Sequence, residues 1–275
     1  MRQKALLQCE GVNQDMERKT ALVTGSAKGI GRSIALKLAE KGYDIIVNAK
    51  SVRPDFNGET AYDVQRLVEE TGRKAYSCIA DISSHEGRQK ILDCVDEIGR
   101  VDILVNNAGI EPPGKDVLEV TGEELELVLG TNFYGPFALT QQIAKRMIAW
   151  KSSGVIEQAR IAFITSIQAD RVSSGVGYCI SKVAIRNVVQ QLAIRLGEAD
   201  IPVVEFTPGV FLTSMSHNHV ENITNKLETG DWALNRRWGE MDEIGNIVAS
   251  LADGVFDYST GSAIPVSGGM NVFRL

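Results

Sequence analysis

Residues 20–31 read Thr-Ala-Leu-Val-Thr-Gly-Ser-Ala-Lys-Gly-Ile-Gly, and they join a short apolar run to a turn with three glycines. The run Thr20–Thr24 is typical of a buried strand, and Ile30–Lys41 carries apolar side chains at helical spacing before Gly42. Glycines at such a junction permit positive φ angles and let the backbone approach a ligand closely. The amides at the start of the helix favour an anion such as a pyrophosphate. The stretch therefore predicts a nucleotide-binding βα unit; a tight turn without a ligand is the alternative.

Strands and helices alternate along the rest of the chain. Further strands are expected at 44–48, 74–80, 101–105, 160–165, 203–207 and 263–266, and further helices at 59–71, 85–98, 121–150, 178–197 and 241–253. This alternation is typical of βαβ units and a parallel sheet. Pro265 suits an edge strand, because proline cannot donate a ladder hydrogen bond. We expect an α/β fold with a single doubly wound Rossmann-type domain over 17–275, a central parallel sheet flanked by helices, and an N-terminal extension over 1–16.

Composition narrows the function classes. Of the 275 residues, 44% are hydrophobic and 23% are charged, which is typical of a globular protein. The formal net charge is −6 and no basic run occurs, which argues against nucleic-acid binding. No apolar run approaches the roughly 18–20 residues that span a bilayer. The four cysteines form no disulfide or metal pattern, so we expect reduced thiols, a cytoplasmic location and no membrane partner.

Tyr178 and Lys182 are four residues apart at the start of a predicted helix, so their side chains share one face. A phenol titrates near ~10 in water, and a neighbouring ammonium favours the phenolate, so we expect a lowered pKa for Tyr178. Such a tyrosine exchanges a proton with a substrate oxygen near neutral pH. Of the six tyrosines, Tyr178 alone has a lysine four residues later. A surface tyrosine beside a solvated lysine is the alternative for this pattern taken alone.

Two further elements point to one family. The glycine turn has the spacing G-x-x-x-G-x-G, and Asn106-Asn-Ala-Gly109 follows the fourth predicted strand. Together with Tyr178-x-x-x-Lys182 after the fifth strand, they resemble the short-chain dehydrogenase/reductase family over about residues 17–270. The resemblance implies hydride transfer at a nicotinamide and interconversion of a carbonyl and a secondary alcohol.

The resemblance implies four catalytic positions. Tyr178 is the general acid in reduction or the general base in oxidation. Ser166 orients the substrate oxygen, although Thr165 restores the spacing to Tyr178 that is more usual in the family. Lys182 holds the nicotinamide ribose and tunes the tyrosine, and Asn132 supports a proton relay.

The resemblance also implies the contacts of a nicotinamide dinucleotide. They are Gly25, Ser26, Lys28, Gly29, Ile30, Gly31, Lys50, Asp81, Ile82, Asn107, Ala108, Gly109, Tyr178, Lys182, Pro208, Gly209 and Thr213. An NAD enzyme usually has Asp or Glu at the end of the second strand, where this chain has Asn48-Ala-Lys50. The ammonium groups of Lys28 and Lys50 would attract a 2′-phosphate, so we expect NADP(H) to be preferred over NAD(H). A solvated Lys50 without a ligand is the alternative.

The segments that set the substrate in this family are rich in polar side chains here. They are residues 110–117, 167–177 and 214–237. Hydroxyl-rich ligands need such donors and acceptors, so a small molecule such as a sugar or polyol is expected. A 3-oxoacyl-[acyl-carrier-protein] or 3-oxoacyl-CoA thioester is the alternative. A catalytically silent protein that senses the cofactor is another, although such proteins typically lack the tyrosine or the lysine.

Assembly and metal binding complete the expectations. The resemblance implies a homotetramer or homodimer that forms through the helices at 123–150 and 178–197. His217 and His219 flank one residue and have no third ligand nearby in the sequence, so we expect no metal site.

Overall fold

The computed structural model describes residues 18–54 and 58–272. The predicted extension at 1–16 lies outside the described residues. Seven parallel strands form one sheet in the order β3-β2-β1-β4-β5-β6-β7. The strands are β1 Thr20–Val23, β2 Asp44–Ala49, β3 Ala75–Ile79, β4 Ile103–Asn106, β5 Arg160–Ile164, β6 Val203–Pro208 and β7 Ala263–Val266. The strand order reverses between β1 and β4, and ligands of such sheets bind at the carboxyl ends of the strands at this point.

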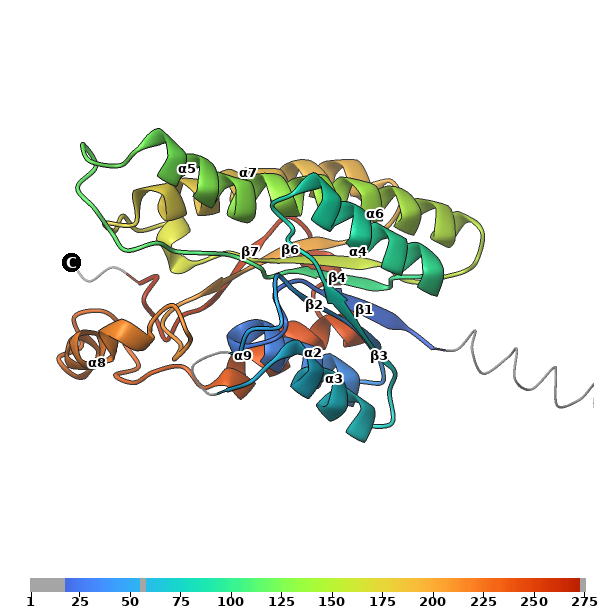
Figure 1. The fold of residues 1–275 in the computed structure, drawn as a ribbon, viewed down its shortest axis with the longest axis horizontal. Helices are drawn as coiled ribbons and strands as arrows, with labels where there is room; N and C mark the ends of the chain where they lie inside the picture. Colours follow the sequence, from blue (N-terminus) through green and yellow to red (C-terminus); the bar gives the residue numbers. More distant parts are fainter. Residues whose placement is uncertain (1–17, 55–57, 273–275) are drawn as a thin grey trace, which may run out of the picture.

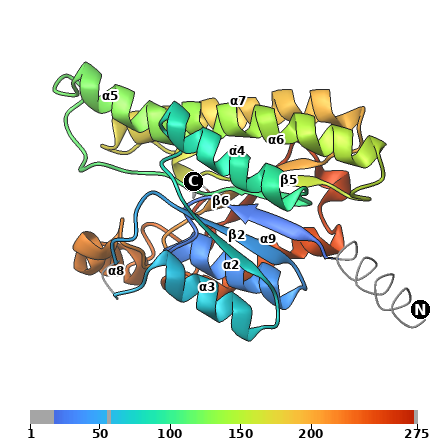
Figure 2. The same cartoon turned by 45° about the vertical axis from the view of Figure 1, so that its right-hand side comes forward.

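Helices cover both faces of the sheet (Figure 1, Figure 2). One face carries α2 Gly29–Glu40, α3 Ala61–Glu70 and α9 Met241–Ala249, and the other carries α4 His85–Ile98, α5 Gly122–Leu129, α6 Gly135–Ser152 and α7 Val176–Gly197. A further helix, α8 Val220–Glu228, lies beyond the carboxyl ends of the strands, beside the α2 layer. The predicted doubly wound single domain is confirmed.

Successive side chains of β1 point to opposite faces of the sheet, so this strand contributes to the core on both faces. Leu22 belongs to the core beneath α4, α6 and α7, whereas Ala21 and Val23 belong to the core beneath α2 and α9. All three are 0% exposed, as expected for a parallel strand that is covered on both faces. Pro265 lies in β7, which pairs with β6 alone and forms an edge of the sheet, as predicted.

The long helical region expected over 121–150 is present, but it is not a regular α-helix throughout. A π-helical turn, Gly130–Tyr134, separates α5 from α6. Pro136 follows it in the first turn of α6, and proline has no N–H to donate to the preceding turn. Such π turns are frequent at functional sites, and this one contains Asn132.

Two other boundaries also differ from the sequence patterns. The helix expected over 241–253 becomes 3₁₀-helical from Ser250. Within 214–237, where no helix was predicted, the chain forms α8 after a 3₁₀ turn at His217–His219. Within the described part of the chain, no helix is long and apolar enough to cross a bilayer.

Candidate active site

The glycine turn, residues 24–31, packs against the loop that follows β4. Asn107 donates from Nδ2 to the carbonyl oxygens of Thr24 and Gly25, at 2.9 and 3.1 Å. Gly25 has φ +64°, and a Cβ added there would lie 2.9 Å from Cα of Ala108. A Cβ on Gly31 would lie 2.4 Å from both Nδ2 of Asn107 and the carbonyl oxygen of Gly25. Close packing therefore requires glycine at both positions, and at Gly25 the positive φ angle requires it as well.

The same turn fits a dinucleotide phosphate. The helix α2 begins at Gly29, and the side chain of its N-cap residue, Lys28, makes no capping hydrogen bond within the described chain. The first amides of this twelve-residue helix have no intrahelical acceptor, and the helix dipole favours an anion, so this end of α2 suits a phosphate. Thr213 arrives from the segment after β6, with Cγ2 at 3.4 Å from where a Cβ on Gly29 would lie. Thr213 therefore lies against the glycine turn, which includes Ile30.

Asn48 is a structural contributor that the sequence reasoning missed. Its Oδ1 accepts from the amide of Gly25 at 3.3 Å, and its Nδ2 donates to the carbonyls of Cys78 and Ala80 at 3.1 Å each. The hydroxyl of Ser26 accepts from the Asn48 amide at 3.1 Å. The whole of Ser26 is 0% exposed, and its amide donates to the carbonyl of Asn48 at 2.9 Å, so this expected cofactor contact instead packs against β2. The sequence offered one sign of this role, because Asn48 is a polar residue inside an apolar strand and a buried polar side chain needs hydrogen-bond partners.

Lys50 and Asp81, both expected to contact the cofactor, contact each other. Nζ of Lys50 lies 2.8 Å from Oδ2 of Asp81, and Oδ1 accepts from the amide and hydroxyl of Ser83. Burial opposes ionisation of Asp81, but the hydrogen bonds from Lys50 and Ser83 outweigh it and lower the pKa of this carboxyl. Ile82 is 4% exposed and packs beneath Gly135.

Three of the predicted catalytic residues meet at the end of β5. Ser166 follows the strand, and its hydroxyl accepts from the amide of Gln168 at 3.1 Å and hydrogen-bonds the phenol of Tyr178. Tyr178 lies in the first turn of α7, and Nζ of Lys182 lies 5.1 Å from the centroid of its ring. Lys182 also donates to the carbonyl of Ile164 at 3.2 Å. All three catalytic side chains are buried.

Burial determines how these groups titrate. It raises the pKa of Tyr178, and the charge of Glu111 raises it further, whereas the hydrogen bond with Ser166 opposes both. Burial lowers the pKa of Lys182 to about 8, although the charges of Glu111 and Glu205 oppose this change. The expected lowering of the Tyr178 pKa is therefore wrong in this structure, because desolvation of the phenolate dominates. A neutral phenol is a proton donor.

Asn132 ties the π turn to two neighbouring elements. Its side chain accepts from the amide of Ile110 at 2.8 Å and donates to the Ile110 carbonyl at 2.9 Å and to the hydroxyl of Ser181 at 3.1 Å. A Cβ on Gly109 would lie 3.4 Å from Oδ1 of Asn132 and 3.6 Å from Nζ of Lys182. The structure therefore brings Gly109, Asn132 and Lys182 together, and Asn132 connects the loop after β4 with α7.

The segment after β6 closes the other side of the site. Pro208 ends β6 opposite Val266, and Gly209 donates to the Val266 carbonyl at 3.0 Å. A Cβ on Gly209 would lie 2.8 Å from Cα of Ser267, so this position also requires glycine. The chain then continues to Thr213 and the glycine turn.

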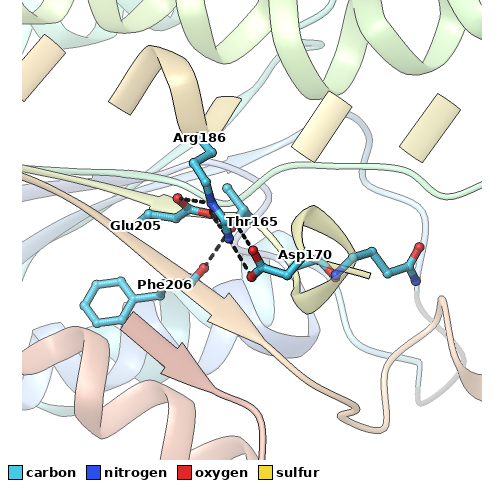
Figure 3. Close-up of polar contacts among 7 residues, drawn as sticks. Thr165, Asp170, Arg186, Glu205 and Phe206 are labelled. Atoms are coloured by element: carbon cyan, nitrogen blue, oxygen red, sulfur yellow. Dashed lines mark hydrogen bonds and ion pairs between the residues drawn. The ribbon is translucent and has the colours of Figure 1, made fainter. Parts of the chain in front are cut away.

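A charged network joins β6, α7 and the loop after β5 (Figure 3). Glu205 on β6 is 1% exposed, and its carboxylate accepts from the hydroxyl of Thr165 and from Arg186 on α7. Arg186 also donates to Asp170, which follows the 3₁₀ turn Ile167–Ala169, with Nη2 at 3.0 Å from Oδ2. The hydroxyl of Thr165 bonds to Glu205 and the Phe206 carbonyl, whereas that of Ser166 bonds to Tyr178, which favours Ser166 as the substrate contact. Sequence reasoning missed the pair, although a glutamate inside a buried strand requires a partner.

Polar side chains also line the loop of residues 167–177, here called the substrate loop. Gln168 donates from Nε2 to Oε1 of Glu111 at 3.1 Å, and its Oε1 accepts from the hydroxyl of Ser173 at 2.6 Å. The thiol of Cys179 donates to the same Gln168 oxygen at 3.3 Å. The described residues contain no group of three or more His, Cys, Asp or Glu side chains that could hold a metal ion.

Comparison with known proteins places this geometry in a family. A family model described as Enoyl-(Acyl carrier protein) reductase matches residues 25–271. The 3-oxoacyl-[acyl-carrier-protein] reductase FabG of Staphylococcus epidermidis is 31% identical over 254 residues, or 92% of this chain and 98% of the relative. A diacetyl reductase [(S)-acetoin forming] of the same species is 31% identical over 268 residues, or 93% and 99% of the two chains.

A solved structure agrees with these relatives. The 3-oxoacyl-[acyl-carrier protein] reductase from Brucella melitensis in complex with NAD superposes with a TM-score of 0.84 at 33% identity, covering 94% of this chain and 99% of the other. The matches extend over nearly the whole chain and include both the glycine turn and the tyrosine–lysine pair. The chain therefore belongs to the short-chain dehydrogenase/reductase family, and it is an NAD(P)-dependent oxidoreductase that interconverts a carbonyl and a secondary alcohol.

Proposed function

We propose that the substrate is a small, polar, hydroxylated carbonyl compound or alcohol, such as a sugar or polyol. The observation that carries this proposal is the hydrogen-bonded set of Glu111, Gln168 and Ser173 beside Tyr178. Polar groups at fixed positions in a binding site orient hydroxylated ligands and penalise apolar ones. The set lies at the carboxyl end of the sheet, where ligands bind in this fold.

The catalytic residues divide the proton chemistry. Tyr178 protonates the carbonyl oxygen during reduction and accepts the alcohol proton during oxidation. Ser166 orients that oxygen through its hydroxyl, and Lys182 holds the cofactor ribose and places a positive charge near the phenol. Asn132 fixes the loop after β4 against α7 next to Lys182 and supports the proton relay. A bound nicotinamide supplies or accepts the hydride.

We also propose that NADP(H) is preferred over NAD(H). The end of β2 offers Asn48 and Ala49 where an acidic residue would repel a 2′-phosphate. Lys28 and Lys50 are exposed at the same end of the sheet, and Lys50 is held there by Asp81. Fluorescence titration of the purified protein should give a lower Kd for NADPH than for NADH; equal or reversed affinities would refute the preference.

A second substrate class is a 3-oxoacyl thioester. It is favoured by the names of relatives, which include 3-oxoacyl-[acyl-carrier-protein] reductases that match nearly the full chain. The third candidate, a catalytically silent cofactor sensor, is opposed by the presence of both Tyr178 and Lys182 in a buried, hydrogen-bonded arrangement.

One assay separates these candidates. Oxidation of NADPH is followed with acetoacetyl thioester and with a panel of sugars and small hydroxyketones, and the reverse reaction with polyols and NADP⁺. Tyr178→Phe should nearly abolish turnover while leaving the Kd for NADPH unchanged, because the phenol oxygen moves the proton and the ring keeps its packing. Thioester turnover without sugar or polyol turnover would replace the first substrate class by the second. Full activity of Tyr178→Phe would overturn the catalytic assignment.

Assembly and location complete the proposal. Ile180, Val183 and Ile194 are 46%, 52% and 78% exposed along α7, which supports a homodimer or homotetramer through α6 and α7. A cytoplasmic location is proposed from the cysteine pattern. The catalytic domain is proposed to occupy residues 17–275, with 1–16 as a separate extension.

A further inference from the structure

Glu111 lies within the active site but has no role in the proton chemistry described above. It lies in the loop after β4 and is half-buried. A Cβ added to Gly175, in the substrate loop, would lie 3.0 Å from Oε1 of Glu111 and 3.6 Å from Cβ of Tyr178. The carboxyl group therefore lies close to both the substrate loop and the catalytic tyrosine.

The charge of Glu111 acts on the reacting centre. Burial raises the pKa of this carboxyl, while the hydrogen bond from Gln168 and the charges of Lys182 and His219 oppose the rise. In return, the carboxylate raises the pKa of both Tyr178 and Lys182. Because the charge of Glu111 affects the pKa of Tyr178 and of Lys182, it must lie close to both. The charge of a half-buried carboxylate is also screened less by solvent than that of a carboxylate on the surface.

One oxygen of Glu111 is available to a ligand. Oε1 accepts from Gln168, whereas Oε2 accepts no hydrogen bond from any of residues 18–54 and 58–272. An ionised carboxylate has acceptor capacity and no donor. Its natural partners are a hydroxyl or an ammonium group, whereas a second carboxylate would be repelled.

We propose that Glu111 is a specificity-determining residue that selects neutral carbonyl substrates with a hydroxyl beside the carbonyl and disfavours substrates with a carboxylate at that position. The inference rests on the proposed function and narrows its substrate class. The attractive element is a hydroxyl that donates to Oε2, and the repulsive element is the like charge. Lys182 does not reverse this selection, because it is 5% exposed and already donates to the carbonyl of Ile164.

Hydroxyacetone and pyruvate provide a matched pair of probes. Both are methyl ketones with three carbon atoms, and they differ in having a hydroxymethyl or a carboxylate group beside the carbonyl. In each reduction the hydride adds to the carbonyl carbon and a proton adds to its oxygen. The measurement is kcat/KM for both ketones with NADPH. We expect the wild type to favour hydroxyacetone, and Glu111→Gln to lower this preference by about tenfold or more.

The conservative variant separates charge from structure. Glutamine keeps an oxygen that accepts from Gln168, so the substrate loop stays in place when the charge is lost. Glu126→Gln removes an exposed carboxylate on α5 and should leave the preference within about twofold, as a control for net charge. An unchanged preference in Glu111→Gln would overturn this inference while the proposed function stands. Failure of the wild type to reduce either ketone would overturn both the proposed substrate class and the inference.

Discussion

The ion pair between Arg186 and Glu205 lends itself to a quantitative test (Figure 3). The Glu205 side chain is 1% exposed, and Nε of Arg186 lies 3.1 Å from its Oε2. Arg186→Met removes every guanidinium contact while keeping an unbranched side chain that can pack. The buried carboxylate would then keep the hydroxyl of Thr165 as a donor but lose its cation. We expect this variant to be markedly less stable than the wild type.

The structure sets the size of the effect. Removing one partner of a buried ion pair costs about 3–5 kcal/mol. The Arg186 side chain is 23% exposed, so water can partly replace it, and the lower end of that range, about 3 kcal/mol, is expected. In a domain of this size each kcal/mol corresponds to about 2–4 °C, so the midpoint of thermal unfolding should fall by ~6–12 °C. Urea and thermal unfolding followed by circular dichroism measure both quantities.

Two companion variants identify the cause. Glu205→Gln, added to Arg186→Met, keeps an acceptor for Thr165 and removes the unpaired charge, so it should recover most of the lost stability. Asp170→Asn breaks only the exposed half of the network and should cost less than about 1 kcal/mol. A loss below about 1 kcal/mol in Arg186→Met, or no recovery in the double variant, would refute the reasoning.

Two further predictions concern the cofactor turn and the catalytic lysine. Gly31→Ala would place a methyl carbon 2.4 Å from Nδ2 of Asn107, so the turn must shift and the Kd for NADPH should rise about tenfold or more in a fluorescence titration; an unchanged Kd would show that the turn tolerates the methyl group. Burial lowers the pKa of Lys182 to about 8 from its ordinary 10.5, so between pH 8 and 10.5 the side chain is a neutral amine in the folded protein but still an ammonium in the unfolded chain, and the wild type gains stability as pH rises through this range. The stability of Lys182→Met relative to the wild type should therefore fall as pH rises from 8 to 10.5 in urea unfolding of the cofactor-free protein, and a constant difference across this range would contradict the lowered pKa.

Much of the fold follows from local sequence patterns. The strands around the glycine turn are apolar on both faces, and each helix of the βα units carries an apolar stripe before a stop signal. The glycine spacing with Tyr178 and Lys182 was enough to indicate the family. These features are local in sequence, so periodicity and spacing reveal them.

What the sequence did not reveal depends on contacts through space. The pairing of Arg186 with Glu205, and of Lys50 with Asp81, is set by the sheet order and not by any motif. The raised pKa of Tyr178 arises from burial, which spacing alone does not encode. The π turn before α6 was likewise hidden inside an unbroken helical pattern, because its cause lies in the packing around Asn132 as well as in the nearby proline.

The strand order also determines when each half of the site can form as the chain folds. Asn48 contacts the glycine turn across 23 residues, Asn107 contacts it across 83, and Ser33 on α2 donates to the carbonyl of Met241 across 208. Contacts between distant residues form slowly, because the entropy of closing the loop is lost before the contact stabilises anything. Synthesis delivers the N-terminal units first, so the turn and Asn48 can meet before Tyr178 has been made. We therefore expect the nucleotide half of the site to form early as a local structure and the catalytic half to be completed late.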